Sequence, residues 1–232
     1  MWPVPTLHSE IITFHFSPDE ISCCWINTTE KKGQCMIKAY EQHALDNLEL
    51  EKLIIFNATH IKNIIINFLS KHHQKNSFIA FSLQGPSIIE DYVEFSTSTP
   101  QREEFGISSS SNVLWGYHYL YQNTQGKFIF YLYKIPQFLL LQYKLLAVAS
   151  QCNIVSMTTQ SAALFTSYKN IFGNEFRHSQ FALDMEKNNN KPKELVPLQK
   201  MLQALIISPH IPIQDHTLLT THYGLFYKSR NL

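Results

Sequence analysis

Three short runs within the first forty residues have the composition of β-strands. EIITFHF occupies residues 10–16, ISCCWI occupies residues 21–26 and CMIKAY occupies residues 35–40. These runs are rich in β-branched and aromatic residues, which favour pleated, half-buried positions. An SPD turn at residues 17–19 and a polar loop that contains Gly33 separate them. Short turns between neighbouring strands predict an antiparallel meander of three strands.

A helix is predicted directly after the meander. Asn57 or Thr59 can cap its start, and the apolar residues that follow repeat at helical spacing. These apolar positions are Ile61, Ile64, Ile65, Phe68 and Leu69.

Beyond this helix the chain alternates between strand-like and helical segments. Strands are predicted at residues 77–83, 113–121, 127–135, 154–157 and 180–184. Helices are predicted at residues 87–95, 136–151, 161–172, 194–207 and 215–228. Residues 96–112 are expected to form a surface loop and residues 186–193 a linker, because both are polar and poor in apolar periodicity. The pattern as a whole predicts an α/β fold.

Composition excludes several classes of function. A net charge of +1 provides no broad basic field for a nucleic-acid backbone, so nucleic-acid binding is disfavoured. Only 7 glycines are present, and the chain contains no GxxxxGK[ST], GxGxxG, GxSxG or HExxH motif. We therefore expect neither a cofactor nor a catalytic site of a familiar type.

The cysteines and histidines do not have the spacing of metal ligands. Cys23 and Cys24 are adjacent, and on a strand they point to opposite faces, so we expect buried free thiols, as for Cys35 and Cys152. The histidines are expected to be solvated or to cap helices. Those considered as ligands are His72, His73, His210, His216 and His222.

Two acidic pairs, Glu90–Asp91 and Glu103–Glu104, raise the question of acid–base catalysis. Neighbouring residues on a helix point in different directions, so we expect these carboxylates to be solvated at the surface.

Nothing near the start of the sequence indicates export. The MWPVP start lacks a basic region followed by an apolar core, and Gln142 and Lys144 interrupt the apolar stretch 138–149. We expect a cytoplasmic protein.

Three stretches in this order resemble PilM, the cytoplasmic actin-like component of type IV pilus assembly. FIAFSLQGP at residues 78–86 is similar to the strand that enters the inserted module of that family. Residues 127–153 are similar to its hairpin strand and long helix, and SAAL at residues 161–164 to its crossover helix. YGL at residues 223–225 is a weaker match to the closing helix.

The resemblance implies an actin-like, or ribonuclease-H-like, first lobe with a mixed sheet. That lobe would comprise residues 7–75 and 134–184, interrupted by a small α/β-hairpin module at residues 76–133. Residues 185–232 would form a helical remnant of the second lobe.

Departures from the family imply that nucleotide function is lost. The family has Asp-x-Gly followed by Ser or Thr in its first hairpin, whereas this chain has HFSPD at residues 15–19. Pro18 also lacks a backbone N–H that could bind phosphate. Asp184 matches the acid of the second phosphate loop, but Glu186 follows it, and a second carboxylate there repels phosphate. Asp184 is thus expected to be a vestigial phosphate-loop acid.

Four aromatic residues alternate along one predicted strand and would share one face: Trp115, Tyr117, Tyr119 and Tyr121. One interpretation is a core face packed on the long helix. The other is a recognition surface for a protein partner, since Tyr and Trp are enriched at interfaces. In the family, a groove between the inserted module and the first lobe receives a short peptide from a membrane-anchored pilus protein. No motif in this chain assigns the groove residues.

The function expected from the resemblance is a non-catalytic adaptor of a pilus or secretion-like assembly platform. It would bind the cytoplasmic tail of a single-span inner-membrane protein and associate with the membrane through such partners only. One alternative is an enzyme with an unfamiliar pocket between the two modules near Asp184. Another is a structural protein whose resemblance is accidental, which predicts no three-stranded meander beside a crossover helix.

Overall fold

The computed structural model describes residues 9–29, 34–46, 50–74, 77–107, 112–173, 198–211 and 216–230. The strands are β1 (Glu10–Phe16), β2 (Glu20–Thr28), β3 (Cys35–Ala44), β4 (Leu50–Glu51), β5 (Ile54–Ile55), β6 (Phe78–Leu83), β7 (Ile89–Phe95), β8 (Val113–Gln122), β9 (Phe128–Pro136), β10 (Asn153–Thr159) and β11 (Leu205–Ile207). The helices are α1 (Ala58–Lys71), η1 (Arg102–Phe105), α2 (Gln137–Ala149), α3 (Gln160–Phe172), α5 (Leu198–Ala204) and α6 (His216–Arg230).

A six-stranded mixed sheet forms the centre of the molecule, in the order β10-β6-β1-β2-β3-β11. Strands β1, β2 and β3 pair antiparallel, while β6 pairs parallel with both β1 and β10. The predicted meander is therefore confirmed. It lies beside connecting helices, so the structure contradicts what an accidental resemblance predicts.

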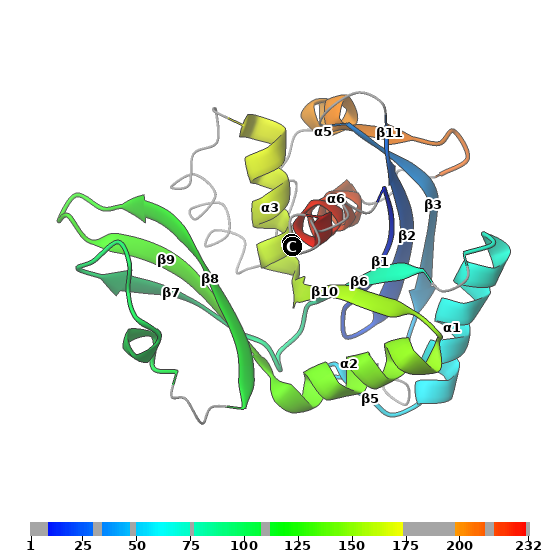
Figure 1. The fold of residues 1–232 in the computed structure, drawn as a ribbon, viewed down its shortest axis with the longest axis horizontal. Coiled ribbons are helices and arrows are strands. Elements are labelled where there is room, and N and C mark those ends of the chain that lie inside the picture. Colours follow the sequence, from blue (N-terminus) through cyan, green and yellow to red (C-terminus); the bar gives the residue numbers. More distant parts are fainter. Residues whose placement is uncertain are drawn as a thin grey trace, which may run out of the picture.

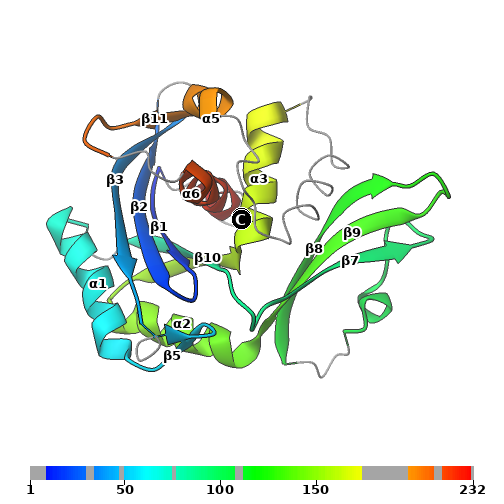
Figure 2. The ribbon, with the colours of Figure 1, turned by 180° about the vertical axis from the view of Figure 1, so that it is seen from behind.

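The two faces of strand β1 meet different partners, because successive side chains point to opposite sides of a strand. Phe14 and Phe16 lie against α1 and α2, where Phe14 contacts Phe68 and Phe16 contacts Tyr143, with ring centroids 6.1 and 4.8 Å apart. Thr13 faces the other way and binds a side chain of α6. Figures 1 and 2 show α6 between the sheet and α3, on the side opposite α1 and α2. The sheet is thus covered on both faces.

The prediction for α1 is confirmed in detail. The Asn57 side chain accepts a hydrogen bond from the His60 backbone N–H, which makes Asn57 the N-cap. The buried residues of α1 are Ile61, Ile64, Ile65, Phe68 and Leu69, as the spacing predicts.

Helices α3 and α6 approach each other closely at Gly224. A Cβ atom at this position would lie 1.8 Å from the carbonyl oxygen of Ala163 and 2.4 Å from Oγ of Ser167. The Ser167 hydroxyl also donates to the Thr220 carbonyl on α6. Only glycine fits at this crossing, which gives the glycine of the YGL stretch a packing role.

His222 anchors α6 to the sheet. Its ring is fully buried, with Nδ1 2.8 Å from Oγ1 of Thr13 and Nε2 2.9 Å from Oγ of Ser22. The expectation of a solvated or capping histidine is therefore wrong for His222. The neighbouring small hydroxyl residues on β1 and β2 create a polar site inside an otherwise apolar layer.

Two predicted helices are wrong in part or in full. Residues 87–95 contain strand β7, which pairs along its whole length with β9. The helix predicted at 194–207 ends at Ala204, and Leu205–Ile207 pair parallel with β3 as β11. In both segments tertiary pairing overrides a weak local preference. The strand predicted at 180–184 and the linker at 186–193 lie outside the described residues, and the domain boundaries stay predictions.

All four cysteines are free and buried, as expected. Burial raises the pKa of the Cys23 and Cys24 thiols well above the usual value.

We predict that Gly224→Ala destabilises the protein by about 3 kcal/mol or more, because the added methyl group must push α6 away from α3. Urea unfolding followed by circular dichroism measures this change. Asn63→Ala, on the exposed face of α1, is the control and should change stability by less than about 0.5 kcal/mol. Equal stability of Gly224→Ala and wild type would show that the close contact does not exist.

Stability should also fall as the pH drops below 6.5. Burial lowers the pKa of His15 to about 4 and that of His118 to about 3, and it lowers the pKa of His222 as well. Below pH 6.5 the unfolded chain binds protons that the folded protein does not, so His15 and His118 each cost about 2 kcal/mol of stability by pH 5, and His222 acts in the same direction. The stability is fully present above pH 6.5.

Replacing one of these histidines tests the cause of this acid sensitivity. His118 stacks on Phe165, with ring centroids 4.4 Å apart, so His118→Phe should pack well and flatten the stability profile between pH 7 and 5. His60→Gln, at an exposed position on α1, should leave the slope unchanged. A slope that His118→Phe leaves intact would rule out His118 as a contributor.

Candidate functional site

The turn between β1 and β2 is the one that the resemblance compares with a phosphate loop. Its Ser17 backbone N–H donates to the Glu20 carbonyl at 3.0 Å, and the Ser17 hydroxyl donates to the Asp19 carboxylate at 2.8 Å. Pro18, between them, has no N–H to offer. Both Ser17 donors are thus used within the turn, and the Asp19 carboxylate would repel a phosphate there. Asp184, the second predicted phosphate-loop residue, lies outside the described residues.

A polar seam joins the three-stranded sheet β7-β9-β8 to the six-stranded sheet. The Glu90 carboxylate on β7 accepts hydrogen bonds from the Tyr131 hydroxyl and, at 3.0 Å, from the Ser161 hydroxyl. Thr159 caps α3 and lies 3.1 Å from the Tyr131 hydroxyl. Burial, together with the Glu90 carboxylate, raises the pKa of Tyr131.

Glu90 therefore has a structural position that the sequence did not suggest. It lies on a strand, where Asp91 points to the opposite face, and it is bonded rather than solvated. Helix α3 has no acidic residue in its own first turn. Glu90, bonded to Ser161, supplies a negative charge beside the positive N-terminal end of that helix instead.

Lys228 of α6 also connects the three-stranded sheet to the six-stranded sheet. Its ammonium donates to Oγ1 of Thr158 at 2.8 Å and to the Tyr133 hydroxyl at 3.2 Å, and it also lies 5.1 Å from the centre of the Tyr133 ring. One side chain thus contacts β10 and β9 together.

A groove of about 410 Å³ lies beside this contact, between the three-stranded sheet and the elements α2, β10 and α6. Its lining is apolar apart from Ser156, the Tyr133 hydroxyl and two lysines, and no acidic side chain is among the described residues that line it. The lining residues are Leu114, Tyr133, Leu140, Lys144, Ile154, Val155, Ser156, Met157 and Lys228. A second hollow of about 350 Å³ shares Leu114, Leu140 and Lys144, so the groove continues along α2.

Strand β10 presents its edge to this groove. It is the terminal strand of the six-stranded sheet, and the four consecutive residues 154–157 all line the groove. Side chains alternate between faces, so four residues in a row reach one cavity only where the strand edge faces it. An irregularity in the pairing of β10 with β6 falls between Ile154 and Ser156. The groove therefore combines apolar side chains with a strand edge.

The predicted aromatic face is correct for three of its four residues. Trp115, Tyr117 and Tyr119 lie opposite Lys134, Leu132 and Phe130 on β9. The register then shifts between Tyr119 and Tyr121, so that Tyr121 lies opposite Ile129. This β-bulge moves Tyr121 to the other face of the sheet, where it packs against the main core.

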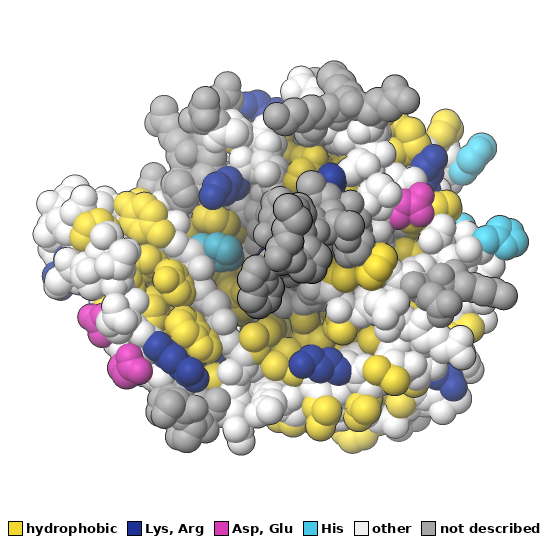
Figure 3. All heavy atoms as spheres, viewed as in Figure 1, with side chains coloured by type: hydrophobic (Ala, Val, Ile, Leu, Met, Phe, Trp, Pro, Cys, Tyr) yellow, Lys and Arg dark blue, Asp and Glu magenta, His cyan; other side chains and the backbone are white. Residues whose placement is uncertain are grey.

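The face that keeps Trp115, Tyr117 and Tyr119 does not pack on the long helix α2. Phe105 of η1 covers it instead, with its ring centroid 4.8 Å from that of Tyr117 and 5.6 Å from that of Trp115. Tyr117 and Tyr119 nevertheless remain about two-fifths exposed. Figure 3 shows hydrophobic side chains gathered over this sheet at the left of the view. A role of these residues in partner binding stays a prediction.

The sequence did not identify the groove residues. Lys144 and Lys228 belong to helices far apart in the chain, and Ile154–Met157 form an ordinary short strand. These residues line one groove only because β10 is the edge strand of the six-stranded sheet. That position depends on the pairing of β10 with β6, which is distant in the chain.

Within the described residues, no helix has both the length and the apolar content needed to cross a bilayer.

No protein-family model matches the sequence, and no curated protein matches it either. Solved structures are similar in fold. A chain of the PilM-PilN type IV pilus biogenesis complex superposes with a TM-score of 0.55 and 11% identity, over 70% of this chain and 51% of that one. The present chain thus spans about half the length of that structure.

Two further structures show a looser similarity. The cytoplasmic domain of EpsL, an inner-membrane component of the type II secretion system of Vibrio cholerae, has a TM-score of 0.42 and 11% identity, over 67% of this chain and 57% of that domain. A Bacteroides thetaiotaomicron protein with an actin-like ATPase fold and unknown function has a TM-score of 0.41 and 12% identity, over 95% and 99% of the two chains. At these identities the likeness is one of fold, and the TM-score of 0.55 to the PilM-PilN chain, with the mixed six-stranded sheet, confirms the predicted α/β fold.

Proposed function

We propose that this chain is a non-catalytic adaptor that binds an extended peptide segment of a membrane-protein partner in the groove between its two sheets. The observation that carries the proposal is the exposed edge of β10 inside an apolar groove. An edge strand offers unpaired backbone N–H and C=O groups, and an extended peptide can pair with them while its side chains enter apolar hollows. This is the geometry of strand addition.

The charges of the groove favour a peptide that carries a carboxylate. Lys144, exposed on α2, lies where the two hollows join, and Lys228 on α6 lines the larger one. With no acidic residue among the described lining residues, the local field attracts negative charge. The expected ligand is therefore an apolar segment with at least one acidic residue.

An assembly role is supported by the fold and by the likeness to the PilM-PilN complex, in which PilM is bound to PilN. On this proposal the chain works in a pilus or secretion-like platform, on the cytoplasmic side of the inner membrane. It is held there by the tail of a single-span membrane protein.

An enzyme in the groove is the second candidate, and the lining argues against it. General acid–base catalysis needs titratable groups that converge on one reacting atom. The described lining offers two lysines and the Tyr133 hydroxyl, and Lys228 is already bonded to Tyr133 and Thr158. This composition suits binding better than proton transfer.

We predict that a photo-crosslinking amino acid at Leu114, which lines both hollows, captures the cytoplasmic tail of a single-span membrane protein in the native cells. The same group at Leu202, exposed on α5, is the control and should not capture that protein. Mass spectrometry of the crosslinked peptide identifies the tail. Capture of soluble enzymes alone from Leu114 would contradict the adaptor proposal.

A synthetic peptide of the captured tail then tests the charge argument. Lys144→Glu should weaken its binding about tenfold by fluorescence anisotropy, because the substitution reverses the charge where the two hollows join. Lys169→Glu, exposed on α3 away from the groove, should leave the affinity within twofold. Equal losses in both variants would show that only net charge matters, and that the groove is not the binding site.

The proposal also includes the loss of nucleotide binding. We expect no saturable heat when Mg-ATP is titrated into the protein in a calorimeter, because the β1–β2 turn uses both Ser17 donors internally, has no N–H at Pro18 and carries the Asp19 carboxylate. An active actin-like ATPase measured under the same conditions is the positive control. Saturable binding at micromolar Mg-ATP would overturn this part of the proposal.

A further inference from the structure

Helix α2 is apolar on its outer face as well as on its inner face. Leu139, Tyr143 and Leu146 are buried against the core, yet the opposite side carries a row of exposed apolar residues. We call this row the α2 stripe. It consists of Phe138, Leu141, Leu145 and Val148, which are 51%, 58%, 59% and 71% exposed.

A helix that is apolar all round is normally buried on all sides. Only the residues Gln137, Gln142 and Lys144 interrupt the apolar sequence of α2. Figure 3 shows hydrophobic side chains along the lower edge of the molecule, where Figure 1 places α2. The α2 stripe is thus an uncovered interface rather than a scatter of single exposed residues.

The spacing of the α2 stripe is that of a helix–helix seam. Its members are separated by three, four and three positions, which is the repeat of the core positions in a coiled coil. The row is about 15 Å long at 1.5 Å per residue. A helix that packs along it can therefore interdigitate side chains over three turns.

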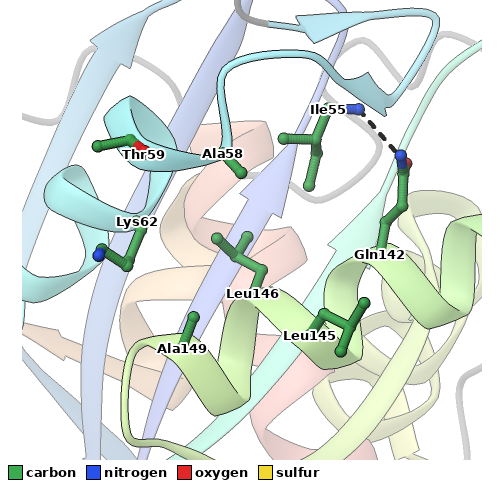
Figure 4. A pocket seen from close by; sticks show the side chains of 8 residues that line it. All are labelled: Ile55, Ala58, Thr59, Lys62, Gln142, Leu145, Leu146 and Ala149. Carbon is green, nitrogen blue, oxygen red and sulfur yellow. Dashed lines mark hydrogen bonds between the residues drawn. The ribbon is translucent and has the colours of Figure 1, made fainter.

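A pocket of about 330 Å³ lies beside one end of the α2 stripe, between α1 and α2 (Figure 4). Leu145 belongs to both the stripe and the pocket, and Ala149 and Ala58 provide small walls. Gln142 lies at its edge and accepts a hydrogen bond from the Ile55 backbone N–H at 3.4 Å, so its amide already has a partner. The pocket can take a bulky apolar side chain.

We infer that the α2 stripe is the interface with a second copy of this chain, paired antiparallel about a two-fold axis. A spacing of three, four and three reads the same in both directions, so the stripe is complementary to itself when reversed. Phe138 of one copy then lies against Val148 of the other, and Leu141 lies against Leu145. Such a surface makes every contact twice, as a two-fold interface requires.

The pocket supports the same arrangement. In this register Phe138 of one copy packs among Leu145, Val148 and Ala149 of the other, beside the pocket opening. The exposed Phe138 ring and the pocket thus lie at the two ends of one helix, about 15 Å apart. Reversal of a second copy brings each ring to the other copy's pocket.

Charge does not drive this pairing. Lys144 is the only charged residue of α2, and its long side chain can keep its ammonium in water at the rim while its stem contacts apolar surface. Because the contact is apolar, added salt should not weaken it. An anionic membrane surface, the other type of partner that an apolar stripe with a lysine could contact, would be released by salt.

Sedimentation equilibrium of the full chain tests the inference. We expect a monomer–dimer equilibrium in the micromolar range that does not weaken between 0.1 and about 0.5 M NaCl. Leu141→Glu with Leu145→Glu should raise the dimer dissociation constant at least tenfold, while Leu202→Glu on α5 should not change it. Circular dichroism confirms that each variant is folded. A wild-type protein that stays monomeric at about 100 µM, or glutamates that leave the dimer intact, would overturn the inference.

Cysteine cross-linking tests the antiparallel register. All four native cysteines are buried, so new surface thiols react selectively. Mixed Leu141→Cys and Leu145→Cys proteins should form a disulfide-linked heterodimer faster than either forms a homodimer, because residue 141 of one copy meets residue 145 of the other. Faster homodimer formation would indicate parallel pairing and overturn the register.

Vesicles of phosphatidylglycerol and phosphatidylcholine address the membrane. The contrary result is that the wild-type protein floats with the vesicles, loses this binding in high salt or with the two glutamate substitutions, and remains a monomer in solution. That combination of results would assign the stripe to the membrane and overturn the inference. The α2 stripe shares Leu141 with the second hollow, but the dimer inference does not require a bound peptide. The peptide assay with Lys144→Glu therefore decides the groove proposal separately.

Discussion

Burial of helix α6 between α3 and the central sheet is the constraint on which the rest of the structure depends. The helix fits because Gly224 allows backbone contact at the α3 crossing, and it is fixed to the sheet by the hydrogen bonds of His222 to Thr13 and Ser22. A buried polar group without partners costs about 1–3 kcal/mol, so this trio fixes one position and one rotation of the helix. A helix in another register would take the His222 ring and the Ser22 hydroxyl away from each other, whereas Thr13 would keep its bond to the Cys24 carbonyl.

The position of α6 also determines the groove. Lys228 lies three turns from the start of that helix and bonds to both Tyr133 and Thr158, so the placement of α6 is transmitted to the junction of the two sheets. Glu90 completes the junction from the other side through Tyr131 and Ser161. The two contacts hold β9 against β10 at one end and leave the edge of β10 open at the other. The open part of that edge is the groove.

Local patterns predicted the elements whose own residues decide their structure. The meander and the buried face of α1 follow from composition and period, and both are confirmed. Asn57, one of the two predicted caps of α1, is the cap in the structure. Elements decided by distant partners were not predicted. Residues 89–95 form a strand because β9 lies beside them, and residues 205–207 do so because β3 does. The bulge that turns Tyr121 away from its aromatic neighbours has no local signal at all, since the alternation of residues continues through it.

The candidate site shows the same division more sharply. The resemblance implied a lost phosphate loop at the contiguous turn Ser17–Asp19 and a peptide groove between the modules. It could not assign the groove residues, because five separate elements contribute them. Helix α2 illustrates why. Its inner face fills the core, its flank at Leu140 and Lys144 lines the groove, and its outer face carries the α2 stripe. Because three apolar surfaces share the thirteen residues of α2, almost no position is polar. The sequence of α2 therefore has the composition of an ordinary buried helix. Because the flank and the stripe share one rigid helix, an occupant of either surface lies next to the other. Binding of a tail and pairing of two copies would therefore meet at Lys144, the one charged residue between them.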